Sequence, residues 1–286
     1  MRNWRQSSRA TAARGAKLDL LSFASRSNWH LRPPVRSDLT MASSWIEYWN
    51  GAPTLYSCAR HREAHDFDIA FSIVNMMSDA RAVVLDFGCG EATRAHFVAN
   101  RCSKLYLMDA ASTVRARLIA RYGTCPNIEI LGEEWHERLP PDSIDLITLN
   151  SVVQYLPQWH FNELLSLFLK VLKPTGSIII SDVIPAHLRP SGDAFELLKF
   201  AHAEGFLREA FTGLLRTALS RYTRTRRVAR LSKYSESNFI ELMRVAGLEA
   251  MRAHKNVGHN QRRMTFVAKP RASNVPSQPI LSNAAE

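Results

Sequence analysis

The residues best suited to chemistry form a short loop after an apolar segment, Asp86-Phe87-Gly88-Cys89-Gly90. Glycine has no Cβ, so the two glycines let backbone N–H groups approach a ligand closely, just before a helix begins. In an open α/β sheet, ligands lie outside the carboxyl ends of the strands, where the strand order switches. The loop is therefore the predicted cofactor site.

Two classes of cofactor use loops of this kind, and the order of acid and glycine separates them. A dinucleotide fingerprint has three glycines in the pattern G-x-G-x-x-G, whereas this chain has Thr93 in place of the third. Asp86 would repel a pyrophosphate, but it can orient the loop and help to hold, through water, a cationic amino-acid group. S-adenosylmethionine carries an ammonium and a sulfonium and no phosphate, so the order favours it over NAD(P).

Short apolar segments alternate with helical segments around this loop. Strands are expected at residues 81–86, 104–109, 128–131, 144–149, 177–181, 248–254 and 264–268. Helices are expected between them at residues 92–101, 112–122 and 161–172. The alternation predicts an α/β fold with a doubly wound, mostly parallel seven-stranded sheet and helices on both faces.

Further helices are expected outside this alternation. Residues 45–49 and 61–77 precede the first strand and predict a helical N-terminal cap. After the fifth strand, residues 183–234 break the alternation and contain two expected helices, within 193–232, which we interpret as a helical lid. An amphipathic helix over residues 235–246 begins at Ser235 or Ser237 and stops at Gly247.

An aspartate also ends the second expected strand, at Asp109, and completes a pattern. With D-x-G-x-G after a first strand and seven alternating strands, the chain resembles the class I S-adenosylmethionine-dependent methyltransferases, over residues 60–182 and, less closely, 235–268. The resemblance implies that Gly88 and Gly90 lie against the methionine part of the cofactor, with Cys89 between them. It also implies that Asp109, followed by Ala110, accepts hydrogen bonds from the two ribose hydroxyls.

The same resemblance assigns two later stretches. After the third strand, either Glu133 or Glu134 is expected to receive the adenine amino group, while Trp135 covers the adenine ring. After the fourth strand, Asn150 begins the expected floor of the active site, near the sulfonium. That stretch lacks the Asn/Asp-Pro-Pro-aromatic pattern of enzymes that methylate adenine or glutamine, which favours a small-molecule acceptor, as in a bacterial subgroup with similar N-terminal segments.

Two residues are candidates for catalysis. His259 lies in the turn before the last strand, as a general base or acceptor ligand or as an ordinary exposed histidine. Tyr48 lies in the N-terminal segment, where small-molecule methyltransferases fold a helix over the cofactor, although core packing with Trp45 and Trp49 is the alternative.

Positive charge is concentrated in two segments of this 286-residue chain of net charge +11. Residues 1–40 form a basic tail expected to be poorly ordered, either a transit peptide or a start upstream of Met41. A second run lacks acids, and it is either a solvated face, a contact with an anionic membrane or a contact with nucleic acid. Its members are Arg216, Arg221, Arg224, Arg226, Arg227 and Arg230.

Composition argues against metal-binding, disulfide-rich and membrane-spanning proteins. The four cysteines form no CxxC pair and have no ligand-like spacing with histidine, which predicts no metal site, no disulfide framework and a cytoplasmic setting. No run approaches the roughly 18 to 20 consecutive apolar residues of a membrane-spanning helix.

The resulting hypothesis is a methyltransferase domain over residues 41–269, with the lid as an insertion and a loose tail over 270–286. It transfers the methyl group of S-adenosylmethionine to an oxygen or nitrogen atom of a small molecule by in-line displacement. The alternatives are an NAD(P)-dependent oxidoreductase on a similar sheet and a non-catalytic basic module that binds RNA or an anionic membrane. The sequence does not predict the oligomeric state.

Overall fold

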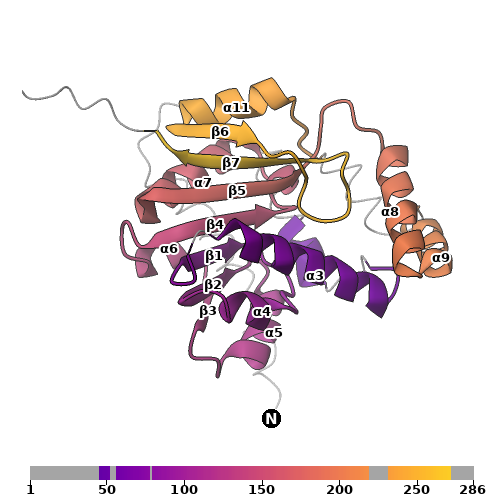
Figure 1. Cartoon of the computed structure of the whole chain (residues 1–286), viewed down its shortest axis with the longest axis horizontal. Coiled ribbons are helices and arrows are strands. Elements are labelled where there is room, and N and C mark those ends of the chain that lie inside the picture. The colour runs from indigo at the N-terminus through magenta and orange to yellow at the C-terminus, as the bar shows by residue number, and fades with distance from the viewer. Residues whose placement is uncertain (1–44, 52–55, 78, 219–230, 272–286) are drawn as a thin grey trace, which may run out of the picture. The chain divides into compact units, whose positions relative to one another are not determined.

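The computed structural model describes residues 45–51, 56–77, 79–218 and 231–271 (Figure 1). Its strands are β1 (Val83–Phe87), β2 (Lys104–Met108), β3 (Ile128–Leu131), β4 (Ile144–Asn150), β5 (Leu172–Val183), β6 (Leu248–Arg252) and β7 (Met264–Pro270). They form one sheet in the order β3-β2-β1-β4-β5-β7-β6. Strands β1 to β5 are parallel, and β7 runs antiparallel to both β5 and β6. The predicted fold class is confirmed.

Helices connect these strands in the expected alternation. They are α3 (Ala59–Met76), α4 (Ala95–Ala99), α5 (Ser112–Tyr122), α6 (Trp135–Arg138), α7 (Gln158–Val171), α8 (Pro190–Glu204), α9 (Leu207–Ala218) and α11 (Glu236–Val245). Residues 45–50 are helical as well, and a short 3₁₀ turn, η1, spans Val153–Tyr155. The side chain of Ser235 accepts a hydrogen bond from the backbone N–H of Asn238, so it is the predicted cap of α11.

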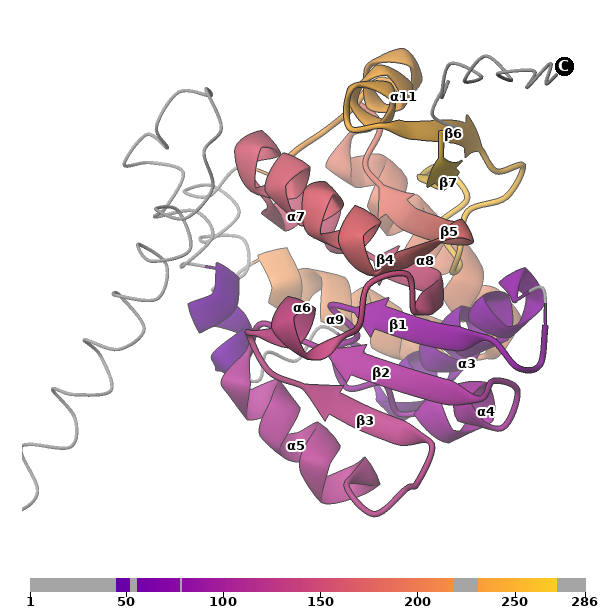
Figure 2. The same ribbon diagram turned by 90° about the vertical axis from the view of Figure 1, so that its left-hand side faces the viewer.

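Alternate residues of the central strands pack into two separate cores. Leu85 of β1 and Ile147 of β4 belong to the core that contains α6, α7 and α11. Val84 and Leu146, their neighbours in sequence, belong to the core that contains α3, α4 and α5. Successive residues of a strand point to opposite faces, so the sheet is covered on both sides, with α7 on one side and α3 and α4 on the other (Figure 2).

The insertion after β5 folds as a helical hairpin. Gly205, at φ 74°, ends α8 in the left-handed conformation, and α9 begins two residues later. Phe206 and the small Ala201 and Ala210 form a separate core cluster between the two helices. Tyr234 bridges to Pro185, which holds the two ends of the insertion together beside β5.

The bounds of several elements differ from those predicted. Helix α5 and strand β3 begin and end as expected, whereas α4 has only five residues because a turn occupies the segment after the glycine loop. The sequence did not predict α6 or η1. The predicted tails fall largely outside the described residues, since only residues 270 and 271 of the C-terminal one are described.

Candidate active site

Asp86 lies at the carboxyl end of β1 and faces the neighbouring strand β4. Its Oδ1 atom accepts a hydrogen bond of 2.8 Å from the hydroxyl of Thr148. Burial raises the pKa of Asp86 to about 6, and the negative charge of Asp109 adds to this effect. The carboxylate is therefore a partly desolvated acid that a nearby cation would stabilise in its ionised form.

The glycine loop that follows Asp86 is fastened to the end of β2. The N–H groups of Gly88 and Cys89 donate to the carbonyl oxygen of Met108 at 2.7 and 3.1 Å, and the N–H of Gly90 donates to Asp109 Oδ2 at 3.0 Å. These amides therefore bind the protein itself, which corrects the expectation that they point at a ligand. Their bonds instead fix the loop against β2.

The two glycines of this loop serve different purposes. Gly88 has φ 72°, and a Cβ atom there would lie 2.4 Å from Cγ2 of Val152, so it permits close packing on the segment after β4. Gly90 has φ 57°, and a Cβ atom there would meet no heavy atom within 4 Å. Gly90 therefore borders open space, as a residue beside a bound cofactor must.

Asp109 follows β2 and connects two loops. Besides Gly90, its carboxylate accepts a hydrogen bond of 2.8 Å from the N–H of Ala111. Burial raises its pKa, although these two backbone bonds oppose the shift. Each carboxylate oxygen has two lone pairs, so Asp109 retains the capacity to accept bonds from two hydroxyl groups.

Arg115, which the sequence did not single out, organises the neighbouring loops from α5. Its guanidinium donates to the carbonyl oxygens of Asp109 at 2.8 Å and of Ala110 at 2.9 Å, and it pairs with Glu133 at 3.0 Å. Both glutamates proposed for adenine are exposed, but Glu133 is tied through Arg115 to the loop of the ribose-binding candidate, while Glu134 precedes α6. A Cβ atom at Gly132 would also meet nothing within 4 Å.

Trp135 lies in the core and not on the cofactor side. Its side chain is 3% exposed, and its ring lies 5.5 Å from those of both Phe87 and Phe168. The indole therefore has no open face for an adenine ring, and the prediction that it covers the adenine is wrong. An isolated tryptophan after a strand gave no signal that would distinguish these two positions.

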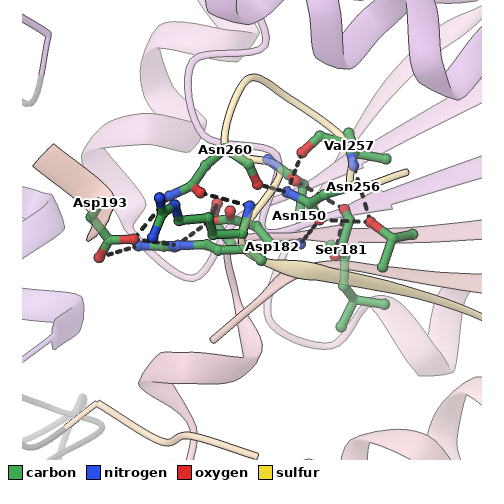
Figure 3. Close-up of polar contacts among 12 residues, drawn as sticks. Asn150, Ser181, Asp182, Asp193, Asn256, Val257 and Asn260 are labelled. Carbon is green, nitrogen blue, oxygen red and sulfur yellow. Dashed lines mark hydrogen bonds and ion pairs between the residues drawn. The ribbon is translucent and has the colours of Figure 1, made fainter. Parts of the chain in front are cut away.

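The ends of β4 and β5 are joined by polar side chains (Figure 3). Asn150 Oδ1 accepts a hydrogen bond of 2.9 Å from Ser181, and the hydroxyl of Ser151 donates to Asp182 at 2.6 Å. Ser151 and Asp182 have φ values of 59° and 61°, a conformation that is uncommon for residues with a side chain. Strained backbone of this kind often marks a functional site.

His259 lies in the β6–β7 loop but is partly buried, contrary to the alternative of an exposed turn histidine. Its ring stacks on Phe200 of α8, with centroids 4.6 Å apart, and lies 5.8 Å from His65 and 6.1 Å from His61 of α3. Burial lowers the pKa of His259 to about 4, so its imidazole is neutral near pH 7. Three distant segments thus converge at His259.

Tyr48 belongs to an aromatic cluster. Its ring makes edge-to-face contacts with Trp45 and Trp49, at centroid distances of 5.7 and 5.6 Å. Trp45 is 2% exposed and packs 4.5 Å from Tyr155 of η1. These contacts favour packing over catalysis for Tyr48.

Thr93, at the position of the missing third glycine, connects the glycine loop to α3. Its hydroxyl donates to Asp66 Oδ2, while Tyr56 donates to Asp66 Oδ1 at 3.4 Å. Burial raises the pKa of Asp66, and these hydrogen bonds lower it. The threonine thus holds the helical cap against the cofactor loop, a role that the sequence analysis missed.

The basic segment after the lid is described only in part. Arg216 of α9 is exposed, as are the apolar side chains of Phe211 and Leu215 on the same helix. The other arginines of the run, from Arg221 to Arg230, lie outside the described residues. Within the described ranges, no group of three His, Cys, Asp or Glu side chains is arranged to hold a metal ion, and no helix has the length and apolar character needed to cross a membrane.

Comparisons with known proteins agree with this geometry. Residues 84–176 match the family model of a methyltransferase domain. A DhpI structure in complex with S-adenosylhomocysteine is 11% identical, with a TM-score of 0.52, and the match covers 81% of this chain and 98% of that one. An S-adenosylmethionine-dependent methyltransferase from Leishmania major is 13% identical, with a TM-score of 0.51, covering 80% and 82% of the two chains. No curated protein matches the sequence.

Residues 84–176 therefore form a methyltransferase domain, and the fold of the chain is that of S-adenosylmethionine-dependent methyltransferases. The family match of this methyltransferase runs from β1 into β5 and so contains Asp86, Asp109 and Glu133. It ends before the lid and His259, so the methyl acceptor is a separate question.

Proposed function

We propose that this methyltransferase acts on a small-molecule acceptor and methylates an oxygen or nitrogen atom. The observation that carries the proposal is the convergence of α3, α8 and the β6–β7 loop around His259. These elements adjoin the ends of β4 and β5, where parallel α/β sheets bind ligands. An acceptor site between a cap, a lid and a loop would enclose a small molecule and would not admit a long polymer.

The cofactor would bind at the ends of β1, β2 and β3. The residues present fit it, because Gly90 and Gly132 both border open space beside Asp109. We assign the ribose hydroxyls to Asp109, the adenine side to Glu133 and Gly132, and the methionine side to Gly90. Asp86, held by Thr148, contributes negative charge near the ammonium and sulfonium.

S-adenosylmethionine supplies a methyl group already activated by its positive sulfur. The protein therefore has to align the acceptor with that methyl group and exclude water. An acceptor O–H or N–H must also lose its proton. We propose that His259 accepts this proton, because its imidazole is neutral near pH 7. The Nδ1 atoms of His259 and of the neighbouring His65 have no hydrogen-bond partner in the described part of the chain.

A structure of similar fold was solved with a small compound bound. The match to a second DhpI structure, a complex with S-adenosylmethionine and a compound designated HEP, covers 83% of this chain and all of that one, with a TM-score of 0.52 at 11% identity. The acceptor of this enzyme needs its own experiment.

Mass spectrometry with trideuteromethyl-labelled cofactor tests the proposal. The enzyme is incubated with the small-molecule fraction of a cell extract, and we expect a product that gains the mass of a trideuteromethyl group. The His259→Gln variant should form it at least about tenfold more slowly while its affinity for S-adenosylhomocysteine stays unchanged. His254→Gln, an exposed histidine of the same region, is the control. Label that appears only in protein or nucleic acid would refute the proposal.

Two further proposals concern the surroundings of the enzyme. All four cysteines, Cys58, Cys89, Cys102 and Cys125, are free thiols, which favours the cytoplasm, and alkylation of the protein inside cells would test this. The exposed Phe211 and Leu215 of α9 favour peripheral contact with an anionic membrane over nucleic acid. Sedimentation with phosphatidylglycerol vesicles, compared with RNA binding, would decide between them.

A further inference from the structure

Arg263 of the β6–β7 loop lies between two carboxylates from different parts of the chain, those of Asp182 and Asp193. Its Nη1 atom is 2.6 Å from Asp182 Oδ2 at the end of β5, and its Nη2 atom is 3.1 Å from Asp193 Oδ2 in the first turn of α8. All three side chains are at most 20% exposed. The guanidinium therefore connects the lid to the sheet in a place largely shielded from water.

Other contacts run between the same loop and the lid. Asn260 donates to Asp193 at 2.8 Å, and Arg262 pairs with Glu196 at 3.0 Å, one turn further along α8. Of the two arginines that pair with the lid, Arg263 is the more shielded, with a side chain 15% exposed against 51% for Arg262. A shielded pair is strongly destabilised when one partner is removed, because the other charge is left without compensation.

Asp182 is also part of the strained pair at the strand ends. Its carboxylate accepts from both Ser151 and Arg263 at 2.6 Å, and its N–H donates to Asn256 at 3.1 Å. Left-handed backbone at a non-glycine residue costs about 1 to 3 kcal/mol and persists only where neighbours enforce it. Arg263 is thus one of the groups that hold the ends of β4 and β5 in this conformation.

We propose that Arg263 is a positioning residue for the acceptor: it fixes α8 over the ends of β4 and β5, so that Phe200 stays stacked on His259. The inference rests on the proposed function, in which the lid forms the acceptor pocket. Cofactor binding does not depend on this contact, since Asp86, Gly90 and Asp109 lie in loops after other strands. Only arginine suits the position, because its planar fork reaches two carboxylates at once.

Hydrogen–deuterium exchange tests the lid without a known acceptor. With S-adenosylhomocysteine bound, Arg263→Met should raise exchange in α8, residues 190–204, by about tenfold and leave α5, residues 112–122, unchanged. Arg263→Lys should give an intermediate value, because it keeps a charge but loses the fork. Arg252→Met is the matched control, since Arg252 forms an exposed ion pair with Glu236 in the same part of the sheet.

Affinity and kinetics separate positioning from general stability. Calorimetry should give an affinity for S-adenosylhomocysteine within about threefold of the wild type for every variant. With the extract fraction that yields labelled product, Arg263→Met should raise the half-saturating amount of acceptor and leave the KM for the cofactor unchanged. Failure to find labelled product would count against the proposed function, while the exchange result would still decide on Arg263.

A second variant protects the test against misfolding. Asp193→Asn removes the lid partner of Arg263 with almost no change in shape and should also raise exchange in α8. Unchanged exchange in α8 for both Arg263→Met and Asp193→Asn would overturn the proposal. An equal rise in α5, or a loss of cofactor affinity greater than about tenfold, would overturn it too, because the effect would then be global.

Discussion

Two regions of the sheet edge differ in how the chain builds them. The cofactor half, to which we assign S-adenosylmethionine, consists of β1, β2, β3 and the loops after them, and its central contact joins Gly90 and Asp109, only 19 residues apart. The acceptor half, to which we assign the methyl acceptor, consists of α3, α8, the ends of β4 and β5, and the β6–β7 loop. There Arg263 contacts Asp193 and Asp182 across 70 and 81 residues.

This difference in sequence separation has a functional consequence. Consecutive strand–loop units hold the cofactor half, so a short motif records it and a family model matches it. Tertiary contacts between remote segments hold the acceptor half, so its side chains can change without altering the cofactor motif. The same sheet can therefore keep one methyl donor and serve different acceptors.

The largest expected effect of a single substitution is in the cofactor half. Asp109→Ala should weaken binding of S-adenosylhomocysteine by about 100-fold, because two hydroxyl hydrogen bonds and two backbone bonds to the loops are lost. Isothermal titration calorimetry measures this, with Asp142→Ala, an exposed acid remote from the loops, as control. An affinity within about threefold of the wild type would exclude the ribose assignment.

Alanine substitutions at the two loop glycines should have separate effects, one on the stability of the fold and the other on cofactor affinity. Gly88→Ala should lower the free energy of unfolding by about 2 kcal/mol, because the new methyl group meets Val152. Gly90→Ala should instead lower cofactor affinity by about 30-fold, because the methyl group enters open space meant for the cofactor. Urea denaturation and calorimetry on both variants check this, and the reverse pattern would contradict the assignment.

Acidification should weaken the acceptor half in preference to the cofactor half. His61 and His259 have pKa values lowered from 6.5 to about 4. As the pH falls from 6.5 to 4, these histidines are protonated in the unfolded chain but not in the folded one, so the free energy of unfolding decreases. Asp86 has the opposite sign: its pKa is raised to about 6, so protonation below pH 6 relieves a buried charge. Asp66 on α3 shifts in the same direction as Asp86 and offsets part of the histidine effect.

Regional exchange at two pH values measures that asymmetry. Between pH 7.5 and pH 5, protection factors in α3 and α8 should fall by about tenfold relative to α5. His259→Gln should reduce the loss, because one titrating ring is removed. Equal changes in all three helices would show that the histidines do not titrate locally.

The smallest expected effect is at the hydrogen bond beneath the cofactor loop. Thr148→Val keeps the buried volume but leaves Asp86 without its donor, so stability at pH 7 should fall by about 1 kcal/mol. The loss should shrink at pH 5, where Asp86 is protonated and the missing bond matters less. A loss that is equal at both pH values would argue against an ionised Asp86 at neutral pH.

The places of Asp86, Gly90 and Asp109 at the strand ends were predictable because the signals for them are local. Asp86, Gly90 and Asp109 each end or follow an apolar strand, and the sheet brings such ends together without further information. The prediction that the amides of the glycine loop are free to bind a ligand was wrong. A motif shows which residues are present but not which atoms their N–H groups already bind. The prediction that Trp135 covers the adenine was wrong for a similar reason. The burial of Trp135 depends on its contact with Phe168 of α7, which is distant in the sequence.

The acceptor half was predicted only as a set of elements. A lid, a cap and His259 followed from broken alternation and residue type, but Arg263 looked like an ordinary charge in a basic turn. Its structural role depends on ion pairs with Asp182 and Asp193, and no helical or strand periodicity in the sequence relates these positions to Arg263. His61 and His65 lie four residues apart on one helix, a spacing that places them on the same face and could have suggested the cluster.

A crystal structure with S-adenosylhomocysteine bound tests the central division most directly. The account predicts ribose hydroxyls on Asp109, adenine beside Gly132 and the sulfur directed toward the ends of β4 and β5, with His259 on the open side. A ligand bound against α8 or the β6–β7 loop, with Gly90 and Gly132 left bare, would contradict it.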